Sequence, residues 1–242
     1  MASILLVGKG EVGDALYKLE EEAGNNIDVA ELDRKPDVGR KYDVMHVCIP
    51  YTERFIGTVI DYGLRYAPNL AIIHSTVPVG TTEHLSDTID FPLVVHSPVR
   101  GVHPHLYKGL KTFIKYVGGY GDAVKKAIEH LKSIGIQTKY LGSSETTELA
   151  KILSTTYYGW NILFAKEAEK ICKIYGLKFE DVYTHANKTY NDGYTKLGRR
   201  NVVRPVLYPP KGTLGGHCLG PNFEFLPSGR LKRMVKELNE NE

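Results

Sequence analysis

The feature that most constrains the fold is a glycine-rich stretch that directly follows a short apolar run. Residues 3–7 are almost entirely apolar, as in a central parallel strand that is covered on both faces. Gly8-Lys9-Gly10-Glu11-Val12-Gly13 follows at once, and apolar residues then recur at helical spacing. The first glycine allows a tight turn, the second lets a pyrophosphate approach the backbone, and the third lets the helix pack on the strand. This segment predicts a strand, a phosphate-binding turn and a helix.

The next strand supplies a second part of the same predicted site. Residues 27–32 are expected to form a strand that ends at Asp33, twenty positions beyond Gly13. A carboxylate there can accept hydrogen bonds from the adenosine ribose hydroxyls of a dinucleotide. It favours NAD over NADP because it would repel a 2′-phosphate, although Arg34 keeps NADP open. The alternative is a glycine-rich turn that binds no ligand. The predicted NAD-binding residues are Gly8, Gly10, Glu11, Val12, Gly13, Asp33, Arg34, Pro50 and Thr76.

Strand-like apolar runs alternate with amphipathic segments as far as residue 134. Strands are expected at 43–49, 70–74, 91–96 and 112–117, and helices at about 53–66 and 122–134. This alternation predicts an α/β fold with a Rossmann-type doubly wound parallel sheet. Ligands of such sheets bind beyond the carboxyl ends of the strands, where Pro50, Thr76 and Ser97 fall.

The pattern becomes helical after Gly142. Ser143 or Ser144 can cap a helix that keeps an apolar period near 3.6 as far as residue 175. A second helix is expected over 178–187, an ordered loop over 188–214, and a charged, solvent-exposed helix in the tail from residue 229. We therefore expect a Rossmann domain at 1–141 and a smaller helical domain at 142–242. Since long apolar helices often pack against a copy of themselves, we expect a homodimer through the 144–175 helix.

Charge and cysteine usage exclude several classes of protein. The 31 basic and 28 acidic residues are balanced and include no long basic run, so nucleic acid is not an expected partner. No apolar run reaches membrane-spanning length, so no membrane partner is expected. The three cysteines are too scattered for a disulfide framework or zinc cluster, which indicates a reducing compartment, the cytoplasm. His103 and His105 have no other ligand type close by in sequence, so no metal site is expected.

A second glycine-rich stretch, Gly215-Gly216-His217-Cys218, presents a thiol. The glycines let the backbone lie close to a bound molecule, and a helix starting there would favour the reactive thiolate. The alternative is that Cys218 is a small buried apolar residue, as many free cysteines are. His217 is expected to fix the backbone, because adjacent side chains seldom face each other.

Four stretches together resemble the UDP-glucose/GDP-mannose dehydrogenase family. They are the Gly8–Gly13 turn, Ser75-Thr76-Val77-Pro78-Val79-Gly80-Thr81-Thr82, Glu148-Leu149-Ala150-Lys151, and Gly212-Thr213-Leu214-Gly215-Gly216-His217-Cys218. They follow the family's order, and the resemblance covers essentially the whole chain. Family members continue into a further C-terminal domain that helps to bind the nucleotide, and this chain is expected to lack it.

The resemblance implies NAD-dependent oxidation of an alcohol of a sugar-like or small polar substrate. In this chemistry Cys218 captures the aldehyde after the first hydride transfer, and a second transfer gives a thioester that water hydrolyses. Lys151 would stabilise the alkoxide, and Thr76 would bond water or cofactor near the nicotinamide. The arginine cluster near the cysteine is either a solvated face or the site of an anionic substrate group. The expected substrate contacts are Arg100, Arg204, Gly216 and His217.

Three polar partners of the family's chemistry are replaced in this chain. Val99 stands where the family has glutamate, Thr155 where it has asparagine, and Asn222 where it has aspartate. Thr155 and Asn222 are kept as catalytic candidates. Valine cannot carry a proton and asparagine cannot act as a general base, so the first oxidation, or its reverse, is expected rather than the four-electron reaction. The alternatives are a dinucleotide-binding protein that has lost catalysis, or a transferase that uses the pocket for S-adenosylmethionine.

Overall fold

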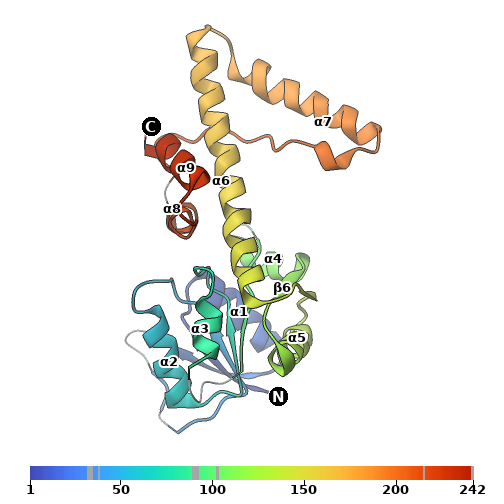
Figure 1. The fold of residues 1–242 in the computed structure, drawn as a ribbon. Coiled ribbons are helices and arrows are strands. Elements are labelled where there is room, and N and C mark those ends of the chain that lie inside the picture. The colour runs from blue at the N-terminus through green and yellow to red at the C-terminus, as the bar shows by residue number, and fades with distance from the viewer. Residues whose placement is uncertain (32–34, 38, 89–92, 102–103, 215, 241–242) are drawn as a thin grey trace. The chain divides into compact units, whose positions relative to one another are not determined.

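The computed structural model describes residues 1–31, 35–37, 39–88, 93–101, 104–214 and 216–240. The chain divides into two compact units, Met1–Lys151 and Ile152–Glu242 (Figure 1). The division falls inside the long helix α6 (Ser144–Ile174). The predicted domain boundary at 141/142 stays a prediction.

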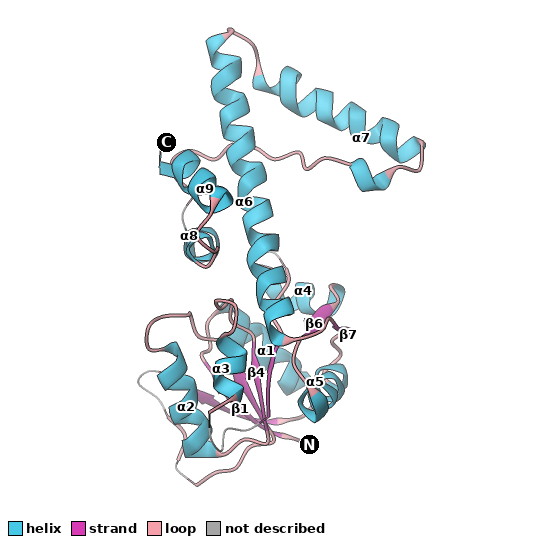
Figure 2. Cartoon of the chain, in the orientation of Figure 1, coloured by secondary structure: helices cyan, strands magenta, loops and turns pink. Residues whose placement is uncertain are grey.

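The first unit is built on a parallel five-stranded sheet in the order β2-β1-β3-β4-β5 (Figure 2). Val7 pairs with Ala30 on one side and with Val47 on the other, so the carboxyl ends of these strands lie in line. The strands are β1 (Ser3–Val7), β2 (Asn26–Ala30), β3 (Val44–Val47), β4 (Leu70–Ile73) and β5 (Leu93–His96). The predicted Rossmann-type α/β fold is confirmed.

Helices cover both faces of this sheet, as the buried strands require. One core contains Leu16 and Leu19 of α1 (Glu11–Glu22) and Leu131 of α5 (Gly121–Ser133). The other contains Phe55 and Val59 of α2 (Phe55–Tyr66). Two short helices that we did not predict, α3 (Thr81–Ser86) and α4 (Leu106–Thr112), add to these layers. β6 (Lys115–Val117) and β7 (Thr138–Tyr140) form a separate parallel pair.

The second unit is helical. After α6, a π-helical turn η1 (Glu180–His185) runs directly into α7 (Ala186–Lys196), and a 3-10 turn η2 (Arg200–Val202) follows. α8 (Gly216–Glu224) and α9 (Arg230–Glu240) complete the chain. Within the described part of the chain, no helix is long and apolar enough to cross a bilayer.

Two expectations for this unit were wrong. The loop predicted from residue 188 begins only after Lys196, because α7 continues to that point. α7 buries no side chain, so it lacks the apolar period from which a helix is recognised. The tail was expected to form a solvent-exposed helix; the helix is present as α9, but its Val235 is completely buried in a core with Leu163 of α6 and Phe223 of α8.

Candidate functional site

The first glycine turn has a shape that only glycine permits at two of its three positions. Gly8 has a φ of +87°, and a Cβ there would lie 2.8 Å from the Ile49 Cγ2 atom. A Cβ on Gly13 would lie 2.0 Å from the Gly8 carbonyl oxygen. Both glycines are therefore needed for β1, the turn and α1 to pack together.

Gly10 differs, because a Cβ there would meet nothing within 4 Å. Gly10 is the residue that precedes the first turn of α1, where backbone N–H groups have no partner within the helix. Open space in front of a helix N-terminus is what a bound pyrophosphate requires. The turn thus fits a dinucleotide phosphate at Gly10.

Polar contacts join neighbouring strand ends beside this turn. The Lys9 backbone N–H donates to the Glu31 Oε1 atom at 2.5 Å, so Glu31, directly after β2, lies against the glycine turn. We did not single out Glu31, although an acid at a strand end next to the glycine turn is a signal that the sequence contains.

The Ser75 hydroxyl donates to the Ile49 carbonyl oxygen at 2.6 Å and ties the end of β4 to the end of β3. Next to these residues, Pro50 is exposed and Thr76 is half-buried. Asp33 and Arg34 lie outside the described residues.

A buried carboxylate fixes the segment from Ser75 to Thr82. Glu148, on α6, is completely buried. Its Oε2 atom accepts the Gly80 backbone N–H at 2.7 Å, and its Oε1 atom accepts the Thr82 backbone N–H and hydroxyl at 2.9 and 2.6 Å. Burial raises the pKa of Glu148, while these three donors oppose that rise. Glu148 thereby holds the Thr76 loop against the part of α6 that carries Lys151.

Lys151 follows Glu148 by three residues and is half-buried. Its Nζ atom donates to the Val99 carbonyl oxygen at 3.0 Å. The Val99 side chain is only 6% exposed and packs in the core of the sheet with Leu106 and Leu110. The position at which the resembling family carries glutamate is therefore an apolar packing position here.

Arg100 is held beside the second, two-stranded sheet. Its guanidinium carbon lies 4.8 Å from the ring centroid of Tyr116 and 6.0 Å from that of Phe113. The Nη1 atom donates to the Ile114 carbonyl oxygen at 3.4 Å. These contacts orient the side chain, and its role in binding substrate stays a prediction.

A buried lysine, which the sequence did not single out, also lies near these strand ends. Lys115 of β6 is 2% exposed, and its Nζ atom donates to the Ser97 carbonyl oxygen at 2.6 Å. Burial lowers the pKa of Lys115 to about 7, because the ammonium form loses its hydration.

The stability of the chain should therefore rise between pH 7 and pH 9. In this range the unfolded chain holds a proton on Lys115 that the folded chain lacks, so raising the pH favours the folded state. We expect a gain of about 2 kcal/mol in the free energy of unfolding, measured by denaturant titration at each pH. Lys115→Met should remove this gain, whereas Lys125→Met, at an exposed position on α5, should keep it. If the free energy of unfolding rose equally with pH in Lys115→Met and in wild type, Lys115 would not be the group responsible.

In the second unit, Cys218 is the third residue of α8, so a helix does begin at the cysteine loop. The side chains of residues 216–219, and Gly215 entirely, lie outside the described part of the chain. The segment before them is anchored on two sides. Lys166 of α6 donates to the Gly212 carbonyl oxygen, and the Leu214 backbone N–H donates to Asn239 Oδ1 of α9 at 2.6 Å. Asn222 is 4% exposed.

The remaining predicted residues of this unit lie on α6 and near α7. Thr155 is half-buried, one turn beyond Lys151 on α6. Arg204 is exposed, and its guanidinium lies 4.0 Å above the ring centroid of Tyr190. Its backbone N–H donates to Asn191 Oδ1 at 2.8 Å. Arg204 is thus oriented by α7 and remains open to solvent.

The predicted residues consequently form two groups. Within the first unit, the structure brings together the glycine turn, the Ser75–Thr82 segment, Val99 and Lys151. Within the second, it brings together the loop at 212–214 and the helix that carries Cys218 and Asn222.

Several curated proteins are similar in sequence to this chain. The chain is 29% identical to the UDP-N-acetyl-D-mannosamine dehydrogenase of Methanococcus vannielii over 213 residues. The aligned region covers 86% of this chain and 44% of that protein. It is 26% identical over 256 residues to the protein of the same name from Pyrococcus horikoshii, over 99% of this chain and 55% of that protein. The chain is a homologue of the UDP-sugar dehydrogenases. It spans about half the length of these curated relatives, and no family model matches it.

Solved structures show the same fold. The UDP-D-ManNAc dehydrogenase of Pyrococcus horikoshii superposes with a TM-score of 0.78 at 18% identity, over 99% of this UDP-sugar dehydrogenase homologue and 68% of that chain. The 3-hydroxyisobutyrate dehydrogenase of Mycobacterium tuberculosis superposes with a TM-score of 0.73 at 15% identity, over 100% of this homologue and 93% of that chain. The resemblance inferred from the four sequence stretches is confirmed.

Proposed function

We propose that this UDP-sugar dehydrogenase homologue is an NAD-dependent dehydrogenase that oxidises an alcohol of a sugar-like or small polar substrate. The observation that carries the proposal is the open space at Gly10, in front of the N-terminus of α1. The names of its relatives, which include UDP-N-acetyl-D-mannosamine dehydrogenase, support a sugar nucleotide as substrate.

The glycine turn would hold the pyrophosphate of NAD, and Asp33 would accept hydrogen bonds from the adenosine ribose. NAD supplies the hydride acceptor when it is bound. Pro50 and Thr76, at the ends of β3 and β4, would line the nicotinamide side of the site. The absence of a side chain at Gly10 is what fits this cofactor, because the phosphates need that space.

Lys151 would stabilise the oxyanion that develops as the hydride leaves. Its ammonium group is on a helix that Glu148 ties to the Thr76 loop, and the Val99 carbonyl fixes its direction. A charge held in place before the reaction is more effective than one that must reorient during it. The substrate hydride would go to NAD and its hydroxyl proton to water, which leaves an aldehyde or ketone.

Cys218 would be the nucleophile that adds to an aldehyde product. Its place in the first turn of α8 supports this role, since a helix N-terminus favours the thiolate. Completing a second oxidation requires acid–base groups that position 99 and position 222 do not supply, because Val99 is apolar and Asn222 does not ionise. We therefore propose a two-electron reaction.

The proposal is tested by NADH formation against UDP-N-acetylhexosamines, free sugars and 3-hydroxy acids. We expect one NADH per substrate molecule consumed and a carbonyl product. Two NADH per substrate would contradict the two-electron reaction. NAD binding without any turnover would favour the alternative in which the protein has lost catalysis. Tighter binding of S-adenosylmethionine than of NAD would favour the transferase.

The exposed Arg204 favours 3-hydroxy acids as a second candidate class of substrate, because its guanidinium could pair with the carboxylate of such a substrate. One solved structure of the same fold is a 3-hydroxyisobutyrate dehydrogenase of Mycobacterium tuberculosis. Faster turnover of a 3-hydroxy acid than of any UDP-sugar would select this class.

We also propose that the protein is a homodimer through α6. Tyr157, Phe164 and Ile171 are 60%, 58% and 54% exposed, and their seven-residue spacing places them on one stripe of the helix. We expect a mass of two chains by light scattering, and a single chain for Phe164→Glu. Lys173→Glu, on the opposite face of α6, should remain dimeric. A monomeric wild type would refute this proposal.

A further inference from the structure

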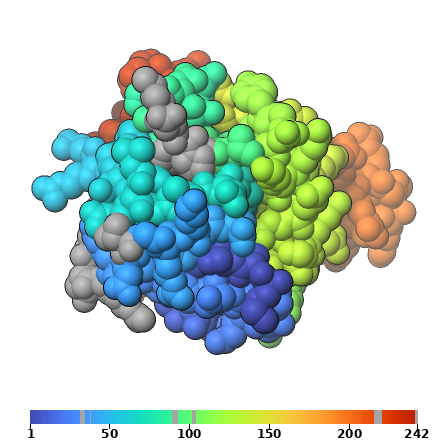
Figure 3. All heavy atoms as spheres, turned by 90° about the horizontal axis from the view of Figure 1, so that it is seen from below, coloured from blue at the N-terminus to red at the C-terminus, as the bar shows by residue number. Residues whose placement is uncertain are grey.

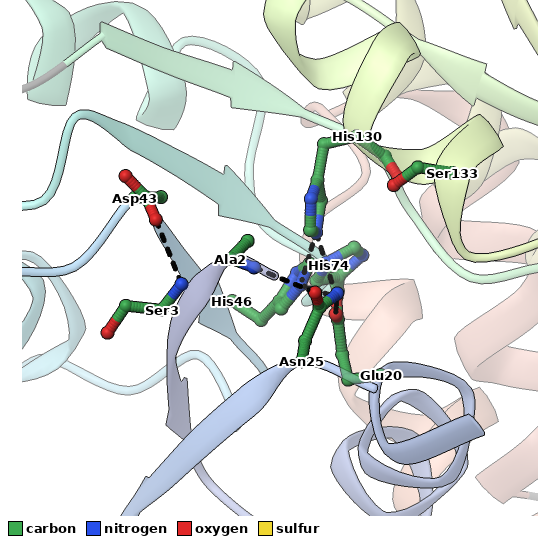
Figure 4. Close-up of polar contacts among 9 residues, drawn as sticks. All are labelled: Ala2, Ser3, Glu20, Asn25, Asp43, His46, His74, His130 and Ser133. Atoms are coloured by element: carbon green, nitrogen blue, oxygen red, sulfur yellow. Dashed lines mark hydrogen bonds and ion pairs between the residues drawn. The ribbon is translucent and has the colours of Figure 1, made fainter. Parts of the chain in front are cut away.

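Three ionisable side chains meet inside the first unit, away from the proposed cofactor turn. Glu20 comes from α1, His46 from β3 and His130 from α5, and their side chains are 1%, 0% and 9% exposed. Glu20 Oε1 lies 2.8 Å from His46 Nε2 and 2.8 Å from His130 Nε2. The two Nε2 atoms lie 3.2 Å apart. Figure 4 shows the three side chains converging on one point.

The hydrogen bonds behind His46 decide where its proton lies. His74 Nδ1 lies 3.0 Å from the Ser97 carbonyl oxygen, which can only accept, so His74 carries its proton on Nδ1. A neutral His74 must then accept at Nε2, which lies 2.8 Å from His46 Nδ1. A neutral His46 therefore carries its proton on Nδ1 and has a bare lone pair at Nε2.

That lone pair faces the Glu20 Oε1 atom, which is itself an acceptor. His46 and His74 are 0% and 2% exposed, and an imidazolium ring in such a buried position would lose its hydration. Two acceptor atoms 2.8 Å apart in a buried site repel each other unless a proton or a metal ion lies between them, and the ligand atoms of Glu20, His46 and His130 lie close enough to share one metal ion.

We propose that Glu20 Oε1, His46 Nε2 and His130 Nε2 bind one divalent transition-metal ion of the Zn²⁺ class, with water as the fourth ligand. Two imidazole nitrogens and one carboxylate oxygen are a donor set that suits Zn²⁺ and its neighbours in the first transition row. Bonds of about 2.0–2.2 Å in a tetrahedron separate ligand atoms by about 3.3 Å. The observed separations of 2.8–3.2 Å reach that value with shifts of about half an ångström or less.

The surroundings of the three ligands match those of known metal sites. A histidine ligand usually donates its other ring N–H to a fixed acceptor, and His46 Nδ1 has His74 Nε2 in that place. The second oxygen of Glu20 accepts the Asn25 side-chain N–H at 2.6 Å, and Asn25 in turn accepts the Ala2 backbone N–H. Two of the three ligands, His46 and Glu20, are therefore oriented by a second group.

The ion would join elements that are far apart in the chain. Glu20 and His130 are separated by 110 positions, and Glu20 and His46 by 26. α5 and the N-terminal residues lie side by side on the surface of this unit (Figure 3). The ion would thus stabilise the unit that holds the proposed dinucleotide site, and its binding free energy would add to that of folding.

The test uses the full chain, freed of metal by a chelator and measured at pH 8. Titration with Zn²⁺ should show one equivalent bound per chain. Free Zn²⁺ at 100 times its Kd should raise the free energy of unfolding by about 2.7 kcal/mol. Co²⁺ in place of Zn²⁺ should give the strong visible absorption of a tetrahedral ion with nitrogen and oxygen ligands.

Variants show whether these ligands are the ones used. His130→Gln, at the most accessible ligand, and Glu20→Gln should each lose the bound equivalent and the Co²⁺ spectrum. His84→Gln, at an exposed histidine on α3, should keep both. If the Glu20 variant fails to fold, the Zn²⁺ titration and the Co²⁺ spectrum of the wild-type protein test the proposal by themselves. Absence of binding at micromolar Zn²⁺, with an imidazolium seen at His46 by ¹⁵N NMR, would show that the cation is a proton and would overturn the proposal. Cobalt–thiolate absorption would overturn it equally, since it would place the ion on a cysteine.

Discussion

Replacing Lys151 with methionine is expected to lower kcat/KM by about 10²–10³-fold while the affinity for NAD stays unchanged. Removing a positioned group that stabilises a developing oxyanion costs about 2.7–4 kcal/mol in other enzymes. Methionine keeps the length of the side chain and loses its charge. The Glu148 contacts with Gly80 and Thr82 remain, so the Thr76 loop should keep its place.

Steady-state kinetics with the best substrate of the panel measures kcat/KM. Calorimetry measures the affinity for NAD. Lys173→Met, on the same helix and exposed, is the matched control and should behave as wild type. Equal losses of NAD affinity and turnover in Lys151→Met would indicate a structural role for Lys151. Unchanged turnover would remove it from the reaction.

Gly10→Val should weaken NAD binding by at least about 100-fold, or 2.7 kcal/mol, without lowering the melting temperature. Gly10 has φ and ψ of −67° and −166°, which a valine can adopt, and a Cβ there meets no protein atom within 4 Å. The valine side chain would instead fill the space that the pyrophosphate needs. Thermal denaturation and NAD titration of the same sample measure both effects.

Two other glycines serve as controls for this change. Gly57→Ala, inside α2, adds a Cβ that also meets nothing, and it should keep NAD binding. Gly13→Ala should instead destabilise the fold, because its Cβ would overlap the Gly8 carbonyl oxygen. If Gly10→Val bound NAD as tightly as wild type, the phosphates would have to lie elsewhere.

The parts of the fold that the sequence predicted are those specified by local patterns. The glycine turn is one, because strand, turn and helix are contiguous between residues 3 and 22. The long helix is another, because it carries a sustained apolar period. α3 and α4 were missed because six and seven residues are too few to show such a period. The part of α7 beyond residue 187 was missed because it is held by polar and aromatic contacts, such as those of Asn191 and Tyr190 with Arg204.

Residues of the candidate site were predictable from the sequence only where they belong to a recognisable motif. Lys151 was singled out from its motif, but Glu148 in the same motif was not, because its partners lie 66 and 68 residues away. The cluster of Glu20, His46 and His130 was missed for the same reason. A weak signal existed, since His46 interrupts a strand of apolar residues and Glu20 follows the buried Leu19 on α1. Such signals mark buried polar positions without identifying their partners.

The most direct test of the central claim is to follow the transferred hydride itself. A substrate with deuterium at its carbinol carbon, incubated with the protein and NAD, should yield NADH that carries one deuterium at the nicotinamide C4, as detected by mass spectrometry. The predicted result is transfer of the label in wild type and transfer slowed by about 10²–10³-fold in Lys151→Met. NAD that is bound but never labelled, with any substrate of the panel, would contradict the proposal that this chain is a dehydrogenase.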